Sequence, residues 1–270
     1  MDYSKLGTAA AESDDLTQNK SFEREVPREG IALLRLREYV ELGRHESRNP
    51  KHKPALKAML VFELSHPDHL VEIDGVKAHG MITVRTNKGA TTKSGYKKLF
   101  NVMNKACGGN KQHFVQMINE PFIADIHHVT TGEGEDKRTY ANLDLDGAWS
   151  LRAPVQIDTL TNVSTPVPVP ELENEAKVFL WENTSVTDAQ ILEMWESIFI
   201  EGEREVEDPV TKKMKTVSKN WIQETIMKNL EWEGSVTQAL TQEDISLDAP
   251  PEEDLSALAG AASSEEVPTI

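Results

Sequence analysis

The sequence is short of several residue types, and each shortage narrows what the protein can be. A single cysteine, Cys107, among 270 residues excludes an intramolecular disulfide and indicates a reducing compartment. Hydrophobic residues make up 38% and aromatic residues 6% of the chain, which predicts that part of it stays uncovered. No apolar run approaches the ~18–20 residues of a membrane span, and the acidic start "MDYSKLGTAAAESDD" does not suit a signal peptide. We expect a soluble, cytoplasmic protein without a membrane partner.

Phosphate-loop and nucleophile motifs are also missing. The segment "ACGGNK" at 106–111 has two glycines and a lysine, but it lacks the first glycine and the Ser or Thr of a P-loop. The chain contains no Gly-x-Ser-x-Gly motif, and Cys107 lies on the apolar face of a predicted helix, where a core role is expected. No nucleophile, base and electrophile come together. We therefore predict a protein that is not an enzyme and needs no cofactor.

Metal chemistry is the remaining catalytic alternative. Two histidine pairs are present, His66 with His69 and His127 with His128. One pair follows a strand in a loop, and adjacent residues on a strand point to opposite faces, so we do not predict a metal site. Asp144 and Asp146 share one face of a predicted strand. A metal-dependent nuclease that uses these two carboxylates is the least favoured of three functional alternatives.

The formal net charge of −16 hides an uneven distribution. Residues 31–111 carry 15 basic and 7 acidic side chains, a net charge of +8, whereas residues 166–270 carry 7 basic and 23 acidic side chains. The basic stretch includes "GRHESRNPKHK" at 43–53, immediately before an apolar segment. A basic segment in an acidic chain is where an anionic polymer is expected to bind. The alternative is that these lysines and arginines only cover a solvated face.

Alternating apolar residues predict short strands in the first 150 residues. The predicted strands are "IALLRLREYVEL", "ALKAMLVFEL", residues 79–86, "PFIADIHHVT" and "RTYANLDLDGAW". In the first strand, the predicted buried face consists of Leu34, Leu36, Val40 and Leu42. Glu38 interrupts that face, which predicts a β-bulge. A helix that Ser94 could cap is predicted between the third and fourth strands, and it ends at the glycines at 108–109.

The composition changes after Asp158. The Pro-rich, acidic "STPVPVPELENEAK" predicts an extended linker over 159–176. A helical extension is predicted over 177–240, with a capping box at Thr187–Gln190 and a second helix beginning at Ser218. Residues 241–270 contain no aromatic residue, Lys or Arg, and predict a disordered acidic tail. Residues 1–25 predict a flexible arm.

These elements predict a mainly β fold with added helices. The order of three strands, a helix and a closing hairpin over 26–158 is typical of an OB-type five-stranded barrel with an interposed helix. Such barrels bind oligonucleotides on the second and third strands and on flanking loops. Several α+β folds share this order, so the functional prediction depends on the side chains.

A protein that binds single strands combines cationic loops, which follow phosphates, with flat side chains on which bases stack. The candidate nucleic-acid-binding residues are Arg35, Arg37, Tyr39, Arg44, Lys51, Lys53, Lys57, Arg85, Lys88, Lys93, Tyr96, Lys97, Lys98 and Tyr140. Tyr39 lies on the predicted polar face of the first strand, where a base could cover it. The alternative is that Tyr39 packs beneath a loop or beneath the C-terminal helices.

Several phrases of the sequence resemble the single-stranded DNA-binding proteins of tailed phages, which have an OB fold. They include "GIALLRL" followed by "ELG", then "KAMLVFEL", "FIADIHHVT" and "RTYANLDLDG". The likeness continues through "VFLWEN", "MWESIFIEG" and "KNWIQETIMKNLEWEGS", and so spans Val26 to Ser235. The acidic tail agrees in character, although its end, "EEVPTI", lacks the terminal aromatic common in tails that dock on replication enzymes.

The residues and the resemblance together predict a largely sequence-independent, single-stranded DNA-binding protein of phage replication or recombination. It would act in the cytoplasm of the host cell, and the acidic tail could contact replication or recombination proteins. The alternative is a phage structural or adaptor protein whose strands and Trp-bearing helices make protein–protein contacts. The basic stretch favours the first reading, because a surface that binds only protein has less need of a net charge of +8.

Overall fold

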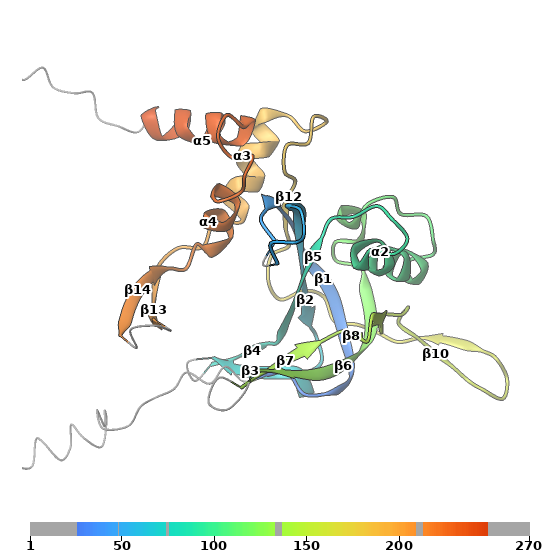
Figure 1. Cartoon of the computed structure of the whole chain (residues 1–270). Helices are drawn as coiled ribbons and strands as arrows, with labels where there is room; N and C mark the ends of the chain where they lie inside the picture. The colour runs from blue at the N-terminus through green and yellow to red at the C-terminus, as the bar shows by residue number, and fades with distance from the viewer. Residues whose placement is uncertain (1–25, 48, 74–75, 133–136, 209–212, 248–270) are drawn as a thin grey trace, which may run out of the picture.

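The computed structural model describes residues 26–47, 49–73, 76–132, 137–208 and 213–247 (Figure 1). The predicted N-terminal arm at 1–25 therefore lies outside the described residues, as does the end of the predicted acidic tail. The fold is mainly β, as the sequence predicts, with few helices.

The centre of the molecule is a sheet of five antiparallel strands, to which β12 (Lys177–Phe179) adds as a sixth strand, parallel to β1. The antiparallel strands are β1 (Gly30–His45), β2 (Ala55–Leu64), β5 (Met81–Asn87), β6 (Pro121–Thr131) and β7 (Arg138–Asn142). They lie side by side in the order β5-β2-β1-β6-β7. The sheet is open, since no ladder in the described parts of the chain joins β5 to β7. The prediction of a closed five-stranded barrel is therefore wrong in this respect.

The long strand β1 changes face at a β-bulge. Its register against β2 shifts between Leu36 and Glu38, where the sequence predicts a bulge, and that prediction is confirmed. One extra residue reverses the alternation of side chains that follows it. As a result Tyr39 joins Leu34 and Leu36 in the main core, while Val40 packs on the opposite face of the sheet. The predicted single buried face of this strand is wrong beyond the bulge.

The main core lies between the sheet and α2 (Gly95–Ala106). Ser94 caps α2 by accepting a hydrogen bond from Lys97 N at 3.1 Å, as the sequence predicts. The helix contributes the buried Leu99 and Met103 to the same core as Leu60 and Phe62 of β2. The short 3-10 helix η2 (Phe114–Met117) adds two further buried side chains to this core.

Four small hairpins extend from this framework. They are β3 (Leu70–Ile73) with β4 (Val76–His79), β8 (Asp144–Leu145) with β9 (Ala148–Trp149), β10 (Val155–Ile157) with β11 (Ser164–Pro166), and β13 (Glu203–Glu207) with β14 (Met214–Ser218). The 3-10 helix η1 (Pro67–His69) precedes β3. The sequence "RTYANLDLDGAW" was predicted as one strand, but it divides into β7 and the β8–β9 hairpin. Asp146 and Gly147, with φ of 52° and 82°, form the turn of this hairpin between β8 and β9.

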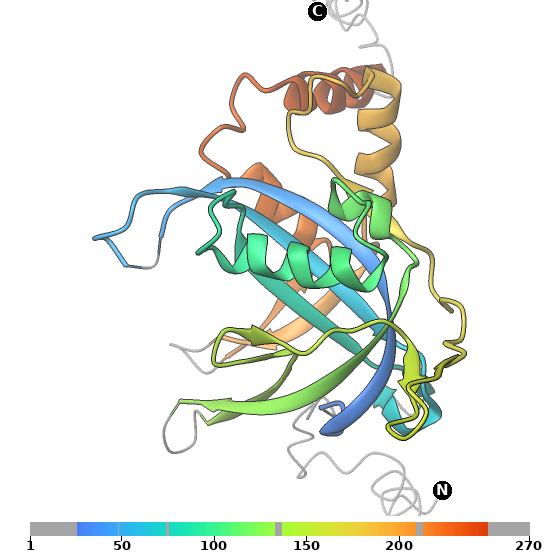
Figure 2. The ribbon, with the colours of Figure 1, turned by 90° about the vertical axis from the view of Figure 1, so that its right-hand side faces the viewer.

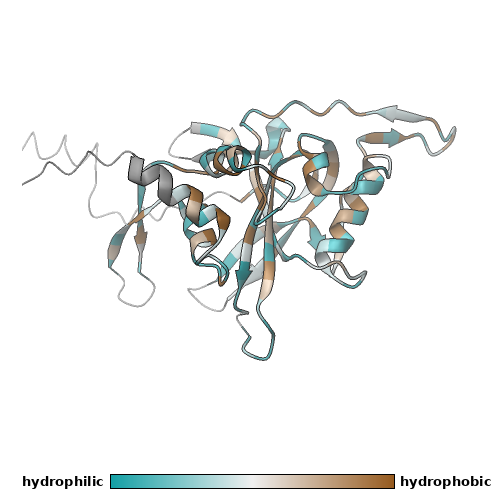
Figure 3. Ribbon diagram, turned by 90° about the horizontal axis from the view of Figure 1, so that it is seen from above, coloured by the Kyte–Doolittle hydropathy of each residue, from teal (hydrophilic) through white to brown (hydrophobic). Residues whose placement is uncertain are grey.

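The C-terminal extension covers the other face of β1 and β2. It consists of β12 (Lys177–Phe179), α3 (Asp188–Ser197), α4 (Trp221–Met227) and α5 (Val236–Leu247). Figure 3 shows the central strands between α2 on one side and these helices on the other. A second core joins Val40, Leu42, Met59 and Val61 to Phe179, Trp181, Ile198, Ile222 and Ile226. Trp195 and Trp232 stack at 5.6 Å between ring centroids at the margin of this core.

The boundaries of the extension differ in part from the sequence prediction. The capping box at Thr187 and Gln190 is confirmed at the start of α3. The next helix, α4, begins at Trp221 after the N-cap residue Asn220, whereas Ser218 ends β14. Helix α5 continues to Leu247, so the first seven residues of the predicted disordered tail are helical, and 248–270 lie outside the described residues.

Candidate nucleic-acid interface

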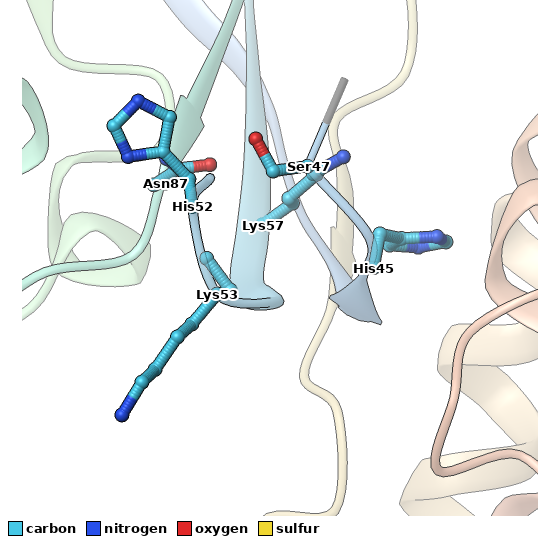
Figure 4. A pocket seen from close by; sticks show the side chains of 7 residues that line it. His45, Ser47, His52, Lys53, Lys57 and Asn87 are labelled. Carbon is cyan, nitrogen blue, oxygen red and sulfur yellow. The ribbon is translucent and has the colours of Figure 1, made fainter. Parts of the chain in front are cut away.

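A polar pocket of about 540 Å³ lies at the end of the sheet where β1 turns into β2. Its lining residues are His45, Ser47, His52, Lys53, Ala55, Lys57 and Asn87, and none of them carries a carboxylate. Figure 4 shows Ser47 and Lys57 close together, His52 beside Asn87, and Lys53 extending away from the strands. Lys51 and Lys53 are exposed, and Lys57 Nζ donates to the carbonyl of Glu46 at 3.2 Å.

The segment that leads into α2 brings further lysines to the same end of the sheet. Figure 2 shows the loop between β1 and β2 next to the N-terminal end of α2. Lys88 N donates to Leu56 O at 2.7 Å, which joins this segment to the start of β2. Lys93 and Lys98 are exposed, and Lys97 Nζ lies 4.8 Å from the ring centroid of Phe100. We name Lys51, Lys53, Lys57, Lys93, Lys97 and Lys98 together the basic end.

A network of hydrogen bonds centred on the buried Glu41 lies next to the basic end. Glu41 is 5% exposed, and it accepts hydrogen bonds from Lys88 Nζ at 2.6 Å and from the Tyr39 hydroxyl at 2.8 Å. Burial raises the pKa of Tyr96 to about 12, so both tyrosines that meet here stay protonated at neutral pH. Burial also lowers the pKa of His113, which lies 3.8 Å from Glu41. Lys88 is thus an internal ion-pair partner rather than a free cation.

Tyr39 is not available to a base. Its side chain is 0% exposed and its ring stacks on Phe114 with centroids 5.5 Å apart. The prediction that Tyr39 presents a stacking surface is corrected, because the bulge at Glu38 turns it into the core. Tyr96 is half-buried and also packs on Phe114, with centroids 5.0 Å apart. These two aromatic side chains are therefore used mainly inside the protein.

Arg35 holds a later segment of the chain against the sheet instead of facing solvent. Its guanidinium donates to the carbonyls of Pro170 at 2.7 Å, Val169 at 2.8 Å and Asn119 at 2.5 Å. It also donates to Glu171 Oε1 at 2.9 Å. With 8% exposure and four of its five N–H donors bonded within the protein, Arg35 is a structural residue rather than a free cation for a phosphate.

The acidic residue Glu63 of β2 also binds the segment that Arg35 contacts. This carboxylate is fully buried and accepts hydrogen bonds from Glu173 N at 2.7 Å, Asn174 Nδ2 at 2.8 Å and His79 Nδ1 at 3.1 Å. Arg37 Nε donates to the carbonyl of Glu175 at 3.1 Å. We name Val169–Glu175 the strap. The predicted linker over 159–176 thus contains half of the β10–β11 hairpin and a segment fixed to the sheet.

Three other predicted residues do not contribute to the basic end. Arg44 pairs with Glu231 at 2.6 Å, and the guanidinium of Arg85 lies 4.6 Å from the ring centroid of Trp221. Tyr140 is 51% exposed on β7. It pairs with Val129, beyond the point where β6 meets the start of β1 at Gly30. Because β1 runs for up to ~50 Å of extended chain, Tyr140 is at the opposite end of the sheet.

The structure therefore brings together six of the fourteen predicted residues, all of them lysines. It adds His45, His52 and Asn87, which the sequence analysis did not select. Both histidines stand in the quoted segment "GRHESRNPKHK" between lysines and arginines. That context is a usable signal for a site that binds anions. Asn87 carries no such signal, because only the pairing of Lys57 with Asn87 brings β5 to this pocket.

The structure offers little to the catalytic alternatives. Among the residues described, no group of three or more His, Cys, Asp or Glu side chains could hold a metal ion. His66 instead accepts a hydrogen bond from Asp68 N at 3.2 Å, and Asp144 accepts one from Gly147 N at 3.3 Å in the β8–β9 turn. Burial raises the pKa of Cys107 to about 11, which keeps its thiol protonated. No helix in the described ranges is long and apolar enough to cross a membrane.

Comparison with known proteins identifies no relative of this chain. A scan of protein-family models, a search of curated proteins and a search of solved structures each found no match.

Proposed function

We propose that this chain binds single-stranded DNA, without catalysis and largely without sequence preference, at the basic end of its sheet. The observation that carries the proposal is a pocket lined by Lys53 and Lys57 and by no carboxylate, at the end of the sheet where the segment carrying Lys93, Lys97 and Lys98 joins β2. Lysines that neutralise phosphates give affinity without reading the sequence. The resemblance to tailed-phage proteins adds replication or recombination as the setting and the host cytoplasm as the location.

The strand order supports an OB-type sheet. An OB fold is a partly open, five-stranded Greek-key barrel, and its ligands contact the second and third strands and flanking loops. Here β2 and β5 are the second and third strands of the main sheet, and the loop at 46–54 leads into β2. The interposed α2 follows β5. The basic end thus includes the loop between the first and second strands, which is one of the elements with which OB folds bind oligonucleotides.

The proposed path of the strand avoids the outer face of β1 and β2. The strap and the C-terminal helices cover that face, and the strap carries Glu171, Glu173 and Glu175, whose carboxylates would repel phosphates. We therefore place the DNA between the loop at 46–54 and the first turn of α2. Since Tyr39 is buried and Tyr96 is half-buried, contacts between lysines and phosphates carry the binding in this proposal, and the preference for single strands rests on the resemblance to the phage proteins.

Fluorescent oligo-dT and a duplex of equal length, titrated at about 50 and about 200 mM salt, test the proposal. We expect tighter binding of oligo-dT than of duplex and a loss of affinity as salt rises. Failure to bind either nucleic acid at the lower salt, or a preference for the duplex, would contradict it. Failure to bind either nucleic acid would also favour the alternative function, a structural or adaptor protein that makes protein–protein contacts.

A further inference from the structure

The β10–β11 hairpin projects from the body of the molecule (Figures 1 and 3). Its tip has a defined conformation, because Asp158 Oδ1 accepts hydrogen bonds from Leu160 N at 2.8 Å and from Thr161 N at 3.1 Å. Asn162 N also donates to Asp158 O at 2.8 Å, and Asp158 N donates to Val163 O at 3.0 Å. A projecting element that is already ordered loses little conformational entropy when a partner binds it.

The hairpin is apolar and almost without charge. Its exposed apolar residues are Val155 at 38%, Ile157 at 56%, Leu160 at 93% and Val163 at 58% exposure. Asp158 is the one charged residue between Ala153 and Pro170, in a chain of which 27% is charged. Interface cores are depleted of charge in this way, and apolar patches on a surface mark sites of protein association. The composition therefore suits a protein partner and offers nothing to an anionic polymer.

The two edges of the hairpin are not equivalent. Gln156 faces Thr165, and the neighbouring backbone bonds join Asp158 to Val163 and Val167 to Pro154. In this alternation Gln156 bonds to β11, so Ile157 N–H and the carbonyls of Val155 and Ile157 point to the free edge of β10. On the β11 side, Pro166 lacks an N–H, and Pro168 and Pro170 follow it. Proline on an edge blocks pairing with another strand.

We propose that the free edge of β10 is a self-association site, at which two copies of this chain pair antiparallel around Gln156. A strand that pairs antiparallel with its own copy makes an isologous contact with two-fold symmetry. In that register Val155 faces Ile157 of the second copy, and the exposed apolar side chains of both hairpins meet. Two chains of net charge −16 repel each other, and the hairpin is a surface on which they can meet without opposing charges.

The proposed contact between two hairpins buries little surface, so the dimer should be weak. Two short hairpins bury less surface than the ~1,200 Å² at the low end of stable protein complexes. The dimer should therefore depend on concentration and dissociate on dilution. The proposal does not depend on DNA binding, so the two can fail separately.

A cysteine pair at the two-fold axis tests the register directly. With Cys107→Ser as background, Gln156→Cys places two sulfur-bearing residues opposite each other, with Cα atoms ~4.5 Å apart in a pair without hydrogen bonds. That spacing lies within the ~4.4–6.8 Å range of disulfides. Thr139→Cys, on exposed β7 at the edge of the main sheet, is the matched control. We expect a disulfide-linked dimer from Gln156→Cys under mild oxidation and little from Thr139→Cys.

Sedimentation of the full chain without added cysteines gives the second readout. We expect a monomer–dimer equilibrium that shifts with concentration, and its loss in Ile157→Lys, which places a charge at the paired edge. Leu160→Ser should weaken the dimer without abolishing it, because the tip adds contact but no strand pairing. The proposal is overturned if the chain stays monomeric at all concentrations, if both cysteine variants cross-link equally, or if Ile157→Lys leaves the dimer intact.

Discussion

The hydroxyl groups of Tyr39 and Tyr96 lie 2.7 Å apart and share a hydrogen bond beneath the first turn of α2. Through this bond β1 is joined to the segment that carries Lys97 and Lys98. The Tyr39 hydroxyl also donates to the buried carboxylate of Glu41, which in turn pairs with Lys88. The aromatic residue that the sequence suggested for base stacking therefore acts as a support of the basic end.

Replacing Tyr39 by Phe removes the shared hydroxyl but keeps the ring in the core. We expect the free energy of unfolding to fall by about 1–3 kcal/mol, because two hydrogen bonds are lost at about 0.5–1.5 kcal/mol each, with unchanged affinity of the folded protein for oligo-dT. Urea unfolding and a fluorescence titration measure the two quantities. Tyr140→Phe, at an exposed position, should change neither stability nor affinity by comparison. Weaker DNA binding by Tyr39→Phe at unchanged stability would reinstate it as a binding residue.

Glu63 should make the stability of the protein depend on acid pH. Burial alone would raise its pKa, but the hydrogen bonds from Glu173, Asn174 and His79 lower it below the ordinary value of 4.5. A carboxyl group with a lowered folded-state pKa stabilises the protein above its unfolded-state pKa, and this contribution is lost as pH falls through the folded-state value.

The variant Glu63→Gln should therefore be less stable at neutral pH, by about 1–3 kcal/mol for a buried group left partly unsatisfied. Its deficit relative to the unmodified chain should shrink as pH falls below 4.5. Glu193→Gln, exposed on α3, is the control and should leave the pH profile unchanged. Equal pH profiles for Glu63→Gln and the unmodified chain would show that the carboxylate does not stabilise the strap.

Gly43 of β1 lies close to Asn229 of the C-terminal extension. Its φ is +80°, and a Cβ atom there would lie 2.5 Å from Cγ of Asn229. Gly108 has a similar φ of +88° with open space around it, so Gly108→Ala measures the backbone strain alone. We expect Gly43→Ala to lower the unfolding temperature clearly more than Gly108→Ala does. Equal decreases of the unfolding temperature in the two variants would mean that Asn229 moves aside without loss of stability.

The acidic tail remains a prediction from sequence. Residues 248–270 contain six acidic residues and no Lys or Arg. A flexible chain of this charge, tethered to the same protein, would reach the basic end at an effective concentration of order millimolar and should compete with DNA. Truncation after Leu247, which keeps α5 intact, should tighten oligo-dT binding, most at low salt where screening is weak. The same truncation should remove any contact with replication proteins. Equal or weaker DNA binding by the truncated chain would show that the tail does not occupy the site.

Local signals in the sequence predicted much of the fold. The caps at Ser94 and Thr187 and the bulge at Glu38 each follow from a few neighbouring residues, and each is present. What could not be predicted depends on contacts between distant segments. Arg35 and Glu63 are a cation and an anion on a strand, and nothing nearby in sequence shows that their partners lie in Val169–Glu175.

The candidate site shows the same limit. Its lysines were recognised from charge alone, because a surface lysine needs no particular partner. The arginines and Tyr39 were misplaced. The arginines contact the strap or the C-terminal extension, and Tyr39 is turned inward by a reversal of strand face at the bulge. Sequence periodicity located the bulge at Glu38. The prediction for Tyr39 did not take into account that the bulge reverses the face on which the following side chains lie.

The central claim, that phosphates bind at the basic end, is tested most directly by the salt dependence of oligo-dT affinity in a charge-deletion variant. Lys51, Lys53 and Lys57 are replaced together by Ala, and the control variant replaces the exposed Lys105, Lys219 and Lys228. Each phosphate contact that is lost should reduce the slope of log affinity against log salt by about 0.7. We predict a lower affinity and a shallower slope for the loop variant alone. An unchanged slope in that variant, or equal losses in both, would contradict the account.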